Sequence, residues 1–189
     1  MKNFSTFLNE HMNVFSNSAD ALLQVNQVAE KIVSALKLGK KVLICGNGGS
    51  AGDAQHFAAE IVGRFEIGTR PALAAIALST DTSALTAIGN DFGFEHIFSR
   101  QVEALCTKGD VVIGFTTSGH SKNVIEACKT AIKRGALPII FTGEKSVSLL
   151  GSSLLQINAP STKTARIQEF HIFCIHCICA LIDEEFGRE

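Results

Sequence analysis

The sequence contains neither tryptophan nor tyrosine, so its 13 phenylalanines must supply the aromatic packing. It also lacks an excess of either charge, because 17 Lys and Arg stand against 18 Asp and Glu, for a formal net charge of -1. This balance argues against a nucleic-acid partner and against binding to an anionic membrane surface. It still allows a local phosphate site, because backbone amides can hold phosphate without changing the net charge.

Long hydrophobic runs are missing as well. The apolar run in residues 71–78 is too short to span a bilayer, and the one in residues 172–182 is short and interrupted by His176. Residues 1–8 hold one lysine and no continuous apolar stretch, which does not indicate a secretory signal. A chain of 189 residues does not need its six cysteines as disulfide staples. We therefore expect free thiols and a soluble, cytoplasmic protein.

Hydrophobic residues make up 46% and charged residues 19% of the chain, as in an ordinary packed domain. Residues 4–38 repeat apolar positions at helical spacing, with a break near Ser18, a plausible N-cap. These two helices hold more apolar residues than one face of a small sheet needs, which suggests a partner subunit. We predict a single domain over residues 1–189, with N-terminal oligomerisation helices in residues 1–38 and an α/β core in residues 39–189.

Short apolar runs dominate the core. They occur at Val42–Cys45, Leu73–Leu78, Val111–Phe115, Leu137–Phe141 and Leu154–Ile157. Polar or glycine residues follow each run, and a helical segment follows most of them. This pattern predicts an α/β fold with a doubly wound, five-stranded parallel sheet covered on both faces. Ligands in such folds gather outside the carboxyl ends of the strands, so we expect the site in the loops that follow Cys45, Leu78 and Phe115.

The loop after the first run, residues 45–52, reads Cys-Gly-Asn-Gly-Gly-Ser-Ala-Gly. Its glycines allow a sharp turn, and free amides at the start of the next helix favour an anion or a polar oxygen. Gly46, Gly48 and Ala51 also fit the looser dinucleotide fingerprint. That motif needs an acidic residue about 20 positions further on, where only Asp81 is available. Nucleotide binding therefore stays as the less favoured interpretation.

In the helix predicted over Asp53–Phe65, His56 and Glu60 stand four residues apart and so share a face. A pair of this kind near the carboxyl end of a strand can bind a metal or transfer protons. It can equally be a hydrogen-bonded surface pair. Because the neighbouring residues are mostly apolar, we expect Glu60 to be partly desolvated, which favours its use as a base.

After the third run, Thr116, Thr117, Ser118 and Ser121 place four hydroxyls in six residues, just before a helix predicted from Asn123. Hydroxyls and amides donate hydrogen bonds to phosphate, and the helix dipole favours its charge. One hydroxyl could simply cap the helix, but a cap accounts for one and not four. The loop therefore predicts a phosphate site.

Residues 164–184 read as one helix, in which Gln168 and His176 lie two turns apart and about 80° apart around the axis. Both could reach one site, whereas His171 points elsewhere and is interpreted as structural or interfacial. From the residues alone, His176 is ambiguous between a core and a functional histidine. The three nearby cysteines at positions 174, 177 and 179 are better explained by apolar packing than by a metal cluster.

Taken together, these motifs resemble one family. The hydroxyl loop is similar to the phosphosugar-binding loop of SIS (sugar isomerase) domains, which have a flavodoxin-like fold. The phosphoheptose isomerase branch of that family is resembled over Lys41–Glu185. The stretches that carry this likeness are the glycine loop with His56 and Glu60, Gly89-Asn90-Asp91-Phe92-Gly93-Phe94, and Ala165-Arg166-Ile167-Gln168-Glu169 leading to His176.

The resemblance implies an aldose-ketose isomerase that converts D-sedoheptulose 7-phosphate to D-glycero-D-manno-heptose 7-phosphate through an enediol, the first step of ADP-heptose biosynthesis for lipopolysaccharide or other surface glycans. It implies a homotetramer built with the N-terminal helices, and Glu60 and His176 as the acid-base pair. It also implies one zinc per subunit, bound by His56, Glu60, Gln168 and His176. The two roles compete at Glu60, because a carboxylate bound to zinc is a weaker base, and we rank the acid-base role first.

Substrate contacts are implied in the same way. They fall on Asn47, Gly48, Gly49, Ser50, Asn90, Asp91, Thr116, Thr117, Ser118, Ser121 and Gln168. The chain departs mildly from the family pattern at Gly52, Thr116 and His120, and none of these changes removes a catalytic group. The main alternative is a non-catalytic SIS-domain regulatory protein of the replication-initiator-associating type, or one that only senses a sugar phosphate. Such a protein can lack the acid-base pair, so the presence of both residues favours an enzyme.

Overall fold

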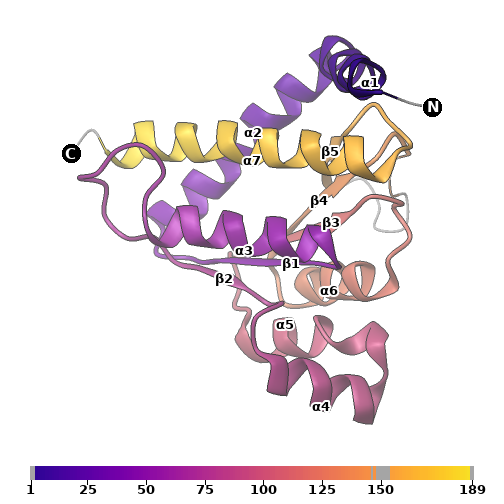
Figure 1. Cartoon of the computed structure of the whole chain (residues 1–189). Coiled ribbons are helices and arrows are strands. Elements are labelled where there is room, and N and C mark those ends of the chain that lie inside the picture. Colours follow the sequence, from indigo (N-terminus) through magenta and orange to yellow (C-terminus); the bar gives the residue numbers. More distant parts are fainter. Residues whose placement is uncertain (1–2, 146, 148–153, 188–189) are drawn as a thin grey trace.

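The structure, a computed structural model, describes residues 3–145, 147 and 154–187 (Figure 1). The outermost residues of the predicted domain, 1–2 and 188–189, therefore lie outside the described residues. The elements follow one another as α1 (Phe4–Ser16), α2 (Ala19–Lys37), β1 (Val42–Gly46), α3 (Gly49–Val62), β2 (Ala75–Ala77), α4 (Thr82–Phe92), the 3₁₀ helix η1 (Phe94–His96), α5 (Ser99–Leu105), β3 (Val111–Thr116), α6 (Lys122–Lys133), β4 (Leu137–Thr142), β5 (Leu155–Asn158) and α7 (Thr164–Phe186).

The strands form one sheet in the order β2-β1-β3-β4-β5, and every neighbouring pair is parallel. The predicted doubly wound, five-stranded parallel sheet is thus confirmed. The chain moves outward from β1 to β2 and then crosses back to β3 on the other side of β1. The loops after β1 and β3 therefore lie side by side at the carboxyl edge of the sheet and lead to helices on opposite faces, which is where α/β folds of this type bind ligands.

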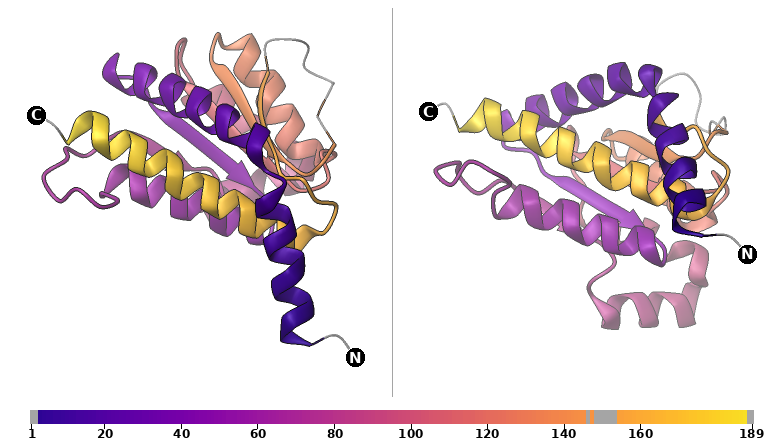
Figure 2. Two further views of the ribbon diagram at one scale, coloured as in Figure 1. Left: turned by 90° about the horizontal axis from the view of Figure 1, so that it is seen from above. Right: turned by 45° about the horizontal axis from the view of Figure 1, so that its top comes forward.

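Two apolar layers sandwich the sheet, because alternate residues of each strand point to opposite faces. Val42 and Ile44 of β1 belong to the larger core, which α2, α3 and α7 cover, whereas Leu43 and Cys45 face the smaller core beneath α5 and α6. Figure 2 shows α2, α3 and α7 together on one side of the sheet. Both faces are buried, which explains why the strands read as nearly continuous apolar runs.

Helix α7 has 23 residues and is long and apolar enough to cross a membrane by length and composition. A core helix of a soluble protein passes the same test. Most of its apolar positions lie in the larger core, where α7 packs against α2 and α3, although Phe173 is 48% exposed, so packing accounts for most of its composition. The six cysteines are free, and five of them are buried.

Local differences from the prediction have physical reasons. Helix α3 begins at Gly49 instead of Asp53, because Gly48 adopts a positive φ of 57° that turns the chain straight into the helix. Ser18 is the N-cap residue of α2, as predicted, but its hydroxyl donates to the carbonyl of Phe15 (2.8 Å) and makes no capping bond to the helix.

Candidate active site

Helices α3 and α7 lie side by side on the sheet and run in the same direction, away from its carboxyl edge (Figures 1 and 2). Gln168 lies beside Gly49 at the start of α3, so closely that a Cβ on Gly49 would stand 2.6 Å from the Gln168 Nε2 atom. Two turns further along both helices, His176 lies beside His56. Because the two helices are parallel, Gln168 and His176, two turns apart on α7, face Gly49 and His56, which are two turns apart on α3.

Three predicted side chains meet at this second position. The Nε2 atom of His176 is 3.3 Å from the Nε2 atom of His56. The same His56 atom is 3.1 Å from Glu60 Oε1. The side chain of Glu60 is 25% exposed, which matches the partial desolvation expected of it. We call His56, Glu60 and His176 the imidazole-carboxylate cluster.

The cluster has two neighbours that the sequence did not single out. The ring of Phe65 stacks on His176, with ring centroids 5.5 Å apart and planes inclined by 24°. Asp53, one turn before His56 on α3, has a buried Oδ2 atom without a hydrogen-bond partner among the described residues. Burial raises the pKa of the Asp53 carboxyl to about 6, and the neighbouring His56 partly opposes that rise. Only the three-residue spacing of Asp53 and His56 could have indicated this proximity.

The hydroxyl loop after β3 contains four hydroxyls that are not equivalent. Thr116 is buried, donates to Ser121 Oγ (2.9 Å) and accepts from the Ser121 amide (3.3 Å), so it braces the loop. Ser121 then keeps its own hydroxyl hydrogen for another acceptor. Ser118 is exposed and accepts the amide of His120 (3.2 Å). Ser121 occupies the N-cap position of α6 without a side-chain capping bond, so helix capping does not explain these hydroxyls.

An amide pair joins this loop to the glycine loop. Asn47 donates to Asn123 Oδ1 (2.9 Å), and Asn123 donates in return to Asn47 Oδ1 (2.8 Å). A cavity of about 200 Å³ opens beside the pair. Its lining residues are Asn47, Phe94, Glu95, Ser121, Lys122 and Asn123. The structure therefore brings the loops after β1 and β3 together, and it adds Asn123, which the sequence had indicated only as a helix start.

Other predicted residues lie apart from this cavity. Asn90 and Asp91, near the end of α4, are exposed, and Asn90 donates to Asp91 Oδ1 (2.8 Å). Glu60 follows Gly49 by 11 positions on α3, which corresponds to about 16 Å along the helix axis. The candidate site accordingly has two parts: the cavity at the loops, and the cluster further along α3 and α7.

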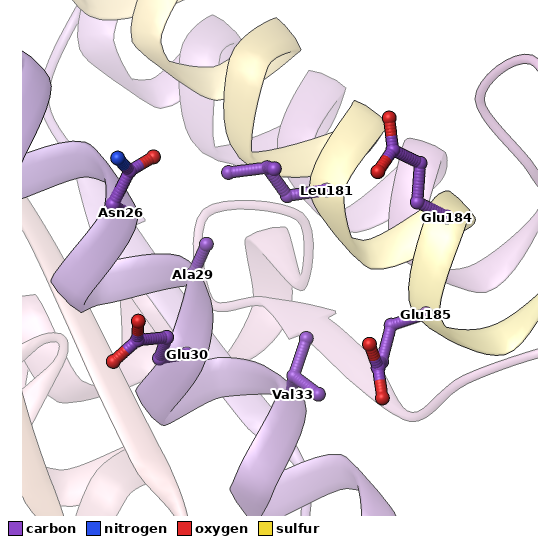
Figure 3. A pocket seen from close by; sticks show the side chains of 7 residues that line it. All are labelled: Asn26, Ala29, Glu30, Val33, Leu181, Glu184 and Glu185. Atoms are coloured by element: carbon purple, nitrogen blue, oxygen red, sulfur yellow. The ribbon is translucent and has the colours of Figure 1, made fainter.

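A larger groove, of about 430 Å³, lies elsewhere, between α2 and α7 (Figure 3). Its lining residues are Asn26, Ala29, Glu30, Val33, Leu181, Glu184 and Glu185. None of the predicted site residues is among them, and three carboxylates make a poor environment for a phosphate. Cavity size alone therefore does not locate the site in this chain.

Comparisons of the sequence and of the structure with known proteins point to the same family. The sequence model of the SIS domain family matches residues 6–143. The phosphoheptose isomerase of Campylobacter concisus is 50% identical over 179 residues, which cover 95% of this chain and 94% of that protein. The solved structure of the phosphoheptose isomerase of Neisseria gonorrhoeae superposes with a TM-score of 0.87 at 45% identity, covering 95% of this chain and 96% of the other. The enzyme of Francisella tularensis superposes with a TM-score of 0.88 at 34% identity, covering 97% and 100%.

Proposed function

Because this chain belongs to the SIS domain family and, within it, to the phosphoheptose isomerases, we propose that it converts D-sedoheptulose 7-phosphate to D-glycero-D-manno-heptose 7-phosphate. It is a sugar-phosphate isomerase. The observation that best supports the reaction is the contact of His176 with His56, which in turn contacts Glu60. Glu60 and His176 are the predicted acid-base residues, and they come from helices more than 100 positions apart in the sequence.

The reaction moves hydrogen between C1 and C2 of the sugar. A base removes a proton from C1 while the C2 carbonyl oxygen is protonated, which gives an enediol. A proton then leaves the C1 hydroxyl and another is added to C2, so that an aldehyde forms at C1 and no redox reagent is needed. We assign these transfers to Glu60 and His176. The Nε2 atom of His56 contacts both His176 (3.3 Å) and Glu60 (3.1 Å). The second contact can fix the position of the Glu60 carboxylate.

The phosphate of the substrate is remote from the reacting carbons, and we assign it to the hydroxyl loop at the start of α6. The hydroxyls of Thr117, Ser118 and Ser121, together with the free amides of the helix N-terminus, suit an anion. Binding energy gained there can hold C1 and C2 in position for chemistry elsewhere. In this arrangement the hydroxyl loop and the imidazole-carboxylate cluster hold opposite ends of the substrate, within one chain or across a subunit interface.

A non-catalytic regulatory role is not favoured. A protein that only senses a sugar phosphate needs the loops but has no use for an acid-base pair that two helices bring to the same imidazole, that of His56. Relatives with 50% and 51% sequence identity, from Campylobacter concisus and Trichlorobacter lovleyi, are named phosphoheptose isomerases. Asp81, the acidic candidate for a dinucleotide ribose, instead caps α4 by accepting the amide of Ala84 (2.9 Å), which argues against a dinucleotide enzyme.

We also propose zinc as a cofactor, with His56, Glu60, Gln168 and His176 as its ligands. In the described part of the chain, no group of three or more His, Cys, Asp or Glu side chains is arranged so that it could hold a metal ion, so side chains would have to move on binding. Two donor separations nevertheless suit one: 3.3 Å between the imidazole nitrogens and 3.1 Å between His56 and Glu60. Zinc with ligand bonds of about 2.0–2.1 Å in a tetrahedron places neighbouring donors about 3.3 Å apart.

His56 thus has a spacing to His176 and a spacing to Glu60 that each suit zinc, while the Gln168 amide lies against Gly49 and would have to turn toward His176. When bound, zinc would polarise the substrate oxygens and stabilise negative charge on the enediolate. Glu60 cannot bind a metal tightly and act as a strong base at the same moment. We therefore keep proton transfer as the primary role of Glu60.

A homotetramer is proposed from the surface of α1. Phe4, Phe7, Leu8 and Met12 repeat at helical spacing and are all exposed in the single chain, Phe4 by 79%. An apolar face of this kind is costly in water and is expected to be covered by further copies of the chain. We place the protein in the cytoplasm, where its product would enter ADP-heptose biosynthesis for lipopolysaccharide. Light scattering after gel filtration measures the assembly, and a monomer at micromolar concentration would contradict it.

The decisive experiment is incubation of the purified chain with sedoheptulose 7-phosphate, with and without a chelator, in deuterated water. Nuclear magnetic resonance should show the C1 proton of an aldose, and deuterium should enter at C2. Enzyme with Glu60→Gln serves as the control for contaminating isomerases. Failure of the wild-type chain to form any aldoheptose phosphate, with zinc supplied, would overturn the proposed reaction.

A further inference from the structure

Arg70 and Asp183 form a buried ion pair between the loop after α3 and the last turns of α7. The Nε atom of Arg70 donates to Asp183 Oδ1 at 2.5 Å. The two residues are only 5% and 2% exposed. Burying two charges is costly unless further hydrogen bonds satisfy them, so the remaining contacts of the pair decide what it does.

Both residues use their remaining polar atoms on the backbone of this region. Arg70 donates from Nη2 to the carbonyl of Glu60 (2.7 Å) and from Nη1 to the carbonyl of Pro71 (2.6 Å). Asp183 Oδ2 accepts the amides of Glu66 (2.6 Å) and Ile67 (2.8 Å). The pair thus ties the end of α3, the following loop and α7 into one hydrogen-bonded unit.

The contact with Glu60 matters because of where Glu60 lies. It is in the last turn of α3, which ends at Val62. The last four carbonyls of a helix lack partners within the helix, and helix ends fray. Arg70 supplies the missing donor for the Glu60 carbonyl. The backbone that carries the proposed base is therefore held at a place where a helix is ordinarily loose.

The same loop also contacts the proposed acid. Phe65, whose ring stacks on His176, lies directly before the two residues whose amides bind Asp183. Asp183 itself follows His176 by seven positions, two turns along the same face of α7. Loss of the ion pair would therefore weaken two contacts at once: the hydrogen bond from Arg70 to the Glu60 carbonyl, and the stacking of the Phe65 ring on His176.

We propose that Arg70 and Asp183 are positioning residues for the isomerisation. Their hydrogen bonds to the Glu60 carbonyl and to the loop after α3 fix Glu60 and His176 relative to each other. The inference rests on the proposed function of the imidazole-carboxylate cluster. Neither residue touches the reacting atoms. Displacement of an acid-base group by about 1 Å is enough to reduce turnover about 100-fold, so a positioning role has a measurable consequence.

The chain offers a matched control in a second buried pair. Lys41 Nζ lies 2.7 Å from Asp110 Oδ2, and Asp110 is fully buried. Asp110 also accepts the amides of Lys41 (3.1 Å) and Thr107 (2.7 Å). This pair joins the start of β1 to the start of β3, at the edge of the sheet opposite the candidate site. Asp110→Asn therefore removes a comparable buried charge without touching α3 or α7.

The test compares Arg70→Lys and Asp183→Asn with Asp110→Asn. Unfolding by urea first ranks the three variants by stability, and kinetics are measured where each is fully folded. We expect kcat to fall about 10- to 100-fold in the first two variants, with KM for sedoheptulose 7-phosphate nearly unchanged. Asp110→Asn should keep kcat within about 2-fold of the wild type at a similar loss of stability. Equal kcat in all three variants would overturn the proposal.

A second measurement does not depend on the substrate. In protein labelled with ¹⁵N at histidine, the His176 imidazole signals should shift in Asp183→Asn and in Phe65→Leu, and stay in place in Asp110→Asn. Unchanged His176 signals in both variants would contradict the positioning role even if one of them were too unstable for kinetics. An inactive wild-type chain with shifted His176 signals would instead contradict the proposed function and leave the structural role supported.

Discussion

The imidazole of His176 on α7 lies 3.3 Å, Nε2 to Nε2, from the imidazole of His56 on α3. The same His56 nitrogen also faces Glu60 at 3.1 Å. One ring nitrogen carries either a hydrogen or a lone pair, so His56 can donate to only one of these partners at a time. The hydrogen bonds available to Glu60 and to His176 are therefore linked through one atom. Such linkage suits a pair that must exchange roles as acid and base during one turnover.

Replacement of Glu60 by glutamine tests the base directly. Glu60→Gln keeps the size of the side chain but removes its ability to take up a proton, so kcat should fall by about 100- to 10,000-fold while KM changes little. Steady-state kinetics and the rate of deuterium exchange at C1 measure the loss. Glu103→Gln, at an exposed carboxylate on α5, is the control and should behave as the wild type. Near-normal turnover in Glu60→Gln would refute the assignment.

Zinc is tested by its effect on stability, which does not require substrate. A metal that binds only the folded chain raises the melting temperature in proportion to the logarithm of its concentration. We expect zinc to raise the Tm of chelator-treated wild-type protein and to have a much smaller effect on His56→Ala, which loses the nitrogen that contacts both His176 and Glu60. Calorimetric titration with zinc chloride gives the stoichiometry. No zinc-dependent shift in the wild-type chain would remove zinc from the proposal.

The hydroxyl loop should govern substrate affinity and not the chemical step. Thr117→Ala combined with Ser118→Ala removes two donors to a charged group, and KM should rise roughly 10- to 100-fold. Thr130→Ala, further along α6, removes a hydroxyl outside the loop and should leave KM unchanged. Kinetics on both variants, with inorganic phosphate as a competing ligand, provide the measurement. An unaltered KM in the double variant would move the phosphate to another part of the chain.

The sequence predicted the fold because the three central strands, β1, β3 and β4, are buried on both faces and therefore appear as short apolar runs. It also indicated the loops after β1 and β3, because their glycines and hydroxyls stand close together in the sequence. Phe65, Arg70 and Asp183 could not be found in that way, since their contacts depend on which helices lie side by side. Asn123 was visible only as the beginning of a helix, because its partner Asn47 is 76 positions away. Contacts between distant segments are set by packing, which no local pattern encodes.

Thr116 illustrates the same limit within one motif. Four hydroxyls within six residues look equivalent in sequence, but β3 extends one residue further than predicted and includes Thr116, which pairs with Thr142 of β4. Its side chain is thereby drawn into the protein, 2% exposed, and bonds Ser121 instead of a ligand. The prediction that the loop offers four hydroxyls to the phosphate should be narrowed to three.

His171 makes a prediction about pH. It is fully buried, its Nε2 atom lies 3.0 Å from the carbonyl oxygen of Thr142, and its Nδ1 atom has no hydrogen-bond partner among the described residues. Burial lowers the pKa of His171 from 6.5 to about 4, so between these values the unfolded chain binds a proton that the folded chain refuses. Its contribution to stability is complete above about pH 6.5 and is lost as the pH falls toward 4, by an amount on the order of 3 kcal/mol.

Urea unfolding of the wild type at several pH values between 7 and 4 measures this loss. In His171→Gln, which can still donate to the Thr142 carbonyl but does not titrate, the free energy of unfolding should depend less on pH by about that amount. His96→Gln, at a half-buried histidine on the opposite face of the sheet, is the control. Identical pH dependence in wild type and His171→Gln would show that His171 is not the group responsible.

Two glycines of the same loop give the sharpest contrast that the chain offers. A Cβ on Gly49 would stand 2.6 Å from Gln168 Nε2 and 2.9 Å from its Cδ atom, whereas a Cβ on Gly52 would meet nothing within 4 Å. Both residues lie in the first turn of α3, so alanine improves helix propensity by up to about 1 kcal/mol at either position. Gly52→Ala should therefore raise the Tm by a few degrees and leave kcat and KM as they are.

Gly49→Ala must push the Gln168 side chain away from the glycine loop, and we expect its kcat/KM to fall at least about 10-fold although the chain stays folded. Equal activity in the two alanine variants would show that the position of Gln168 over Gly49 has no part in the reaction.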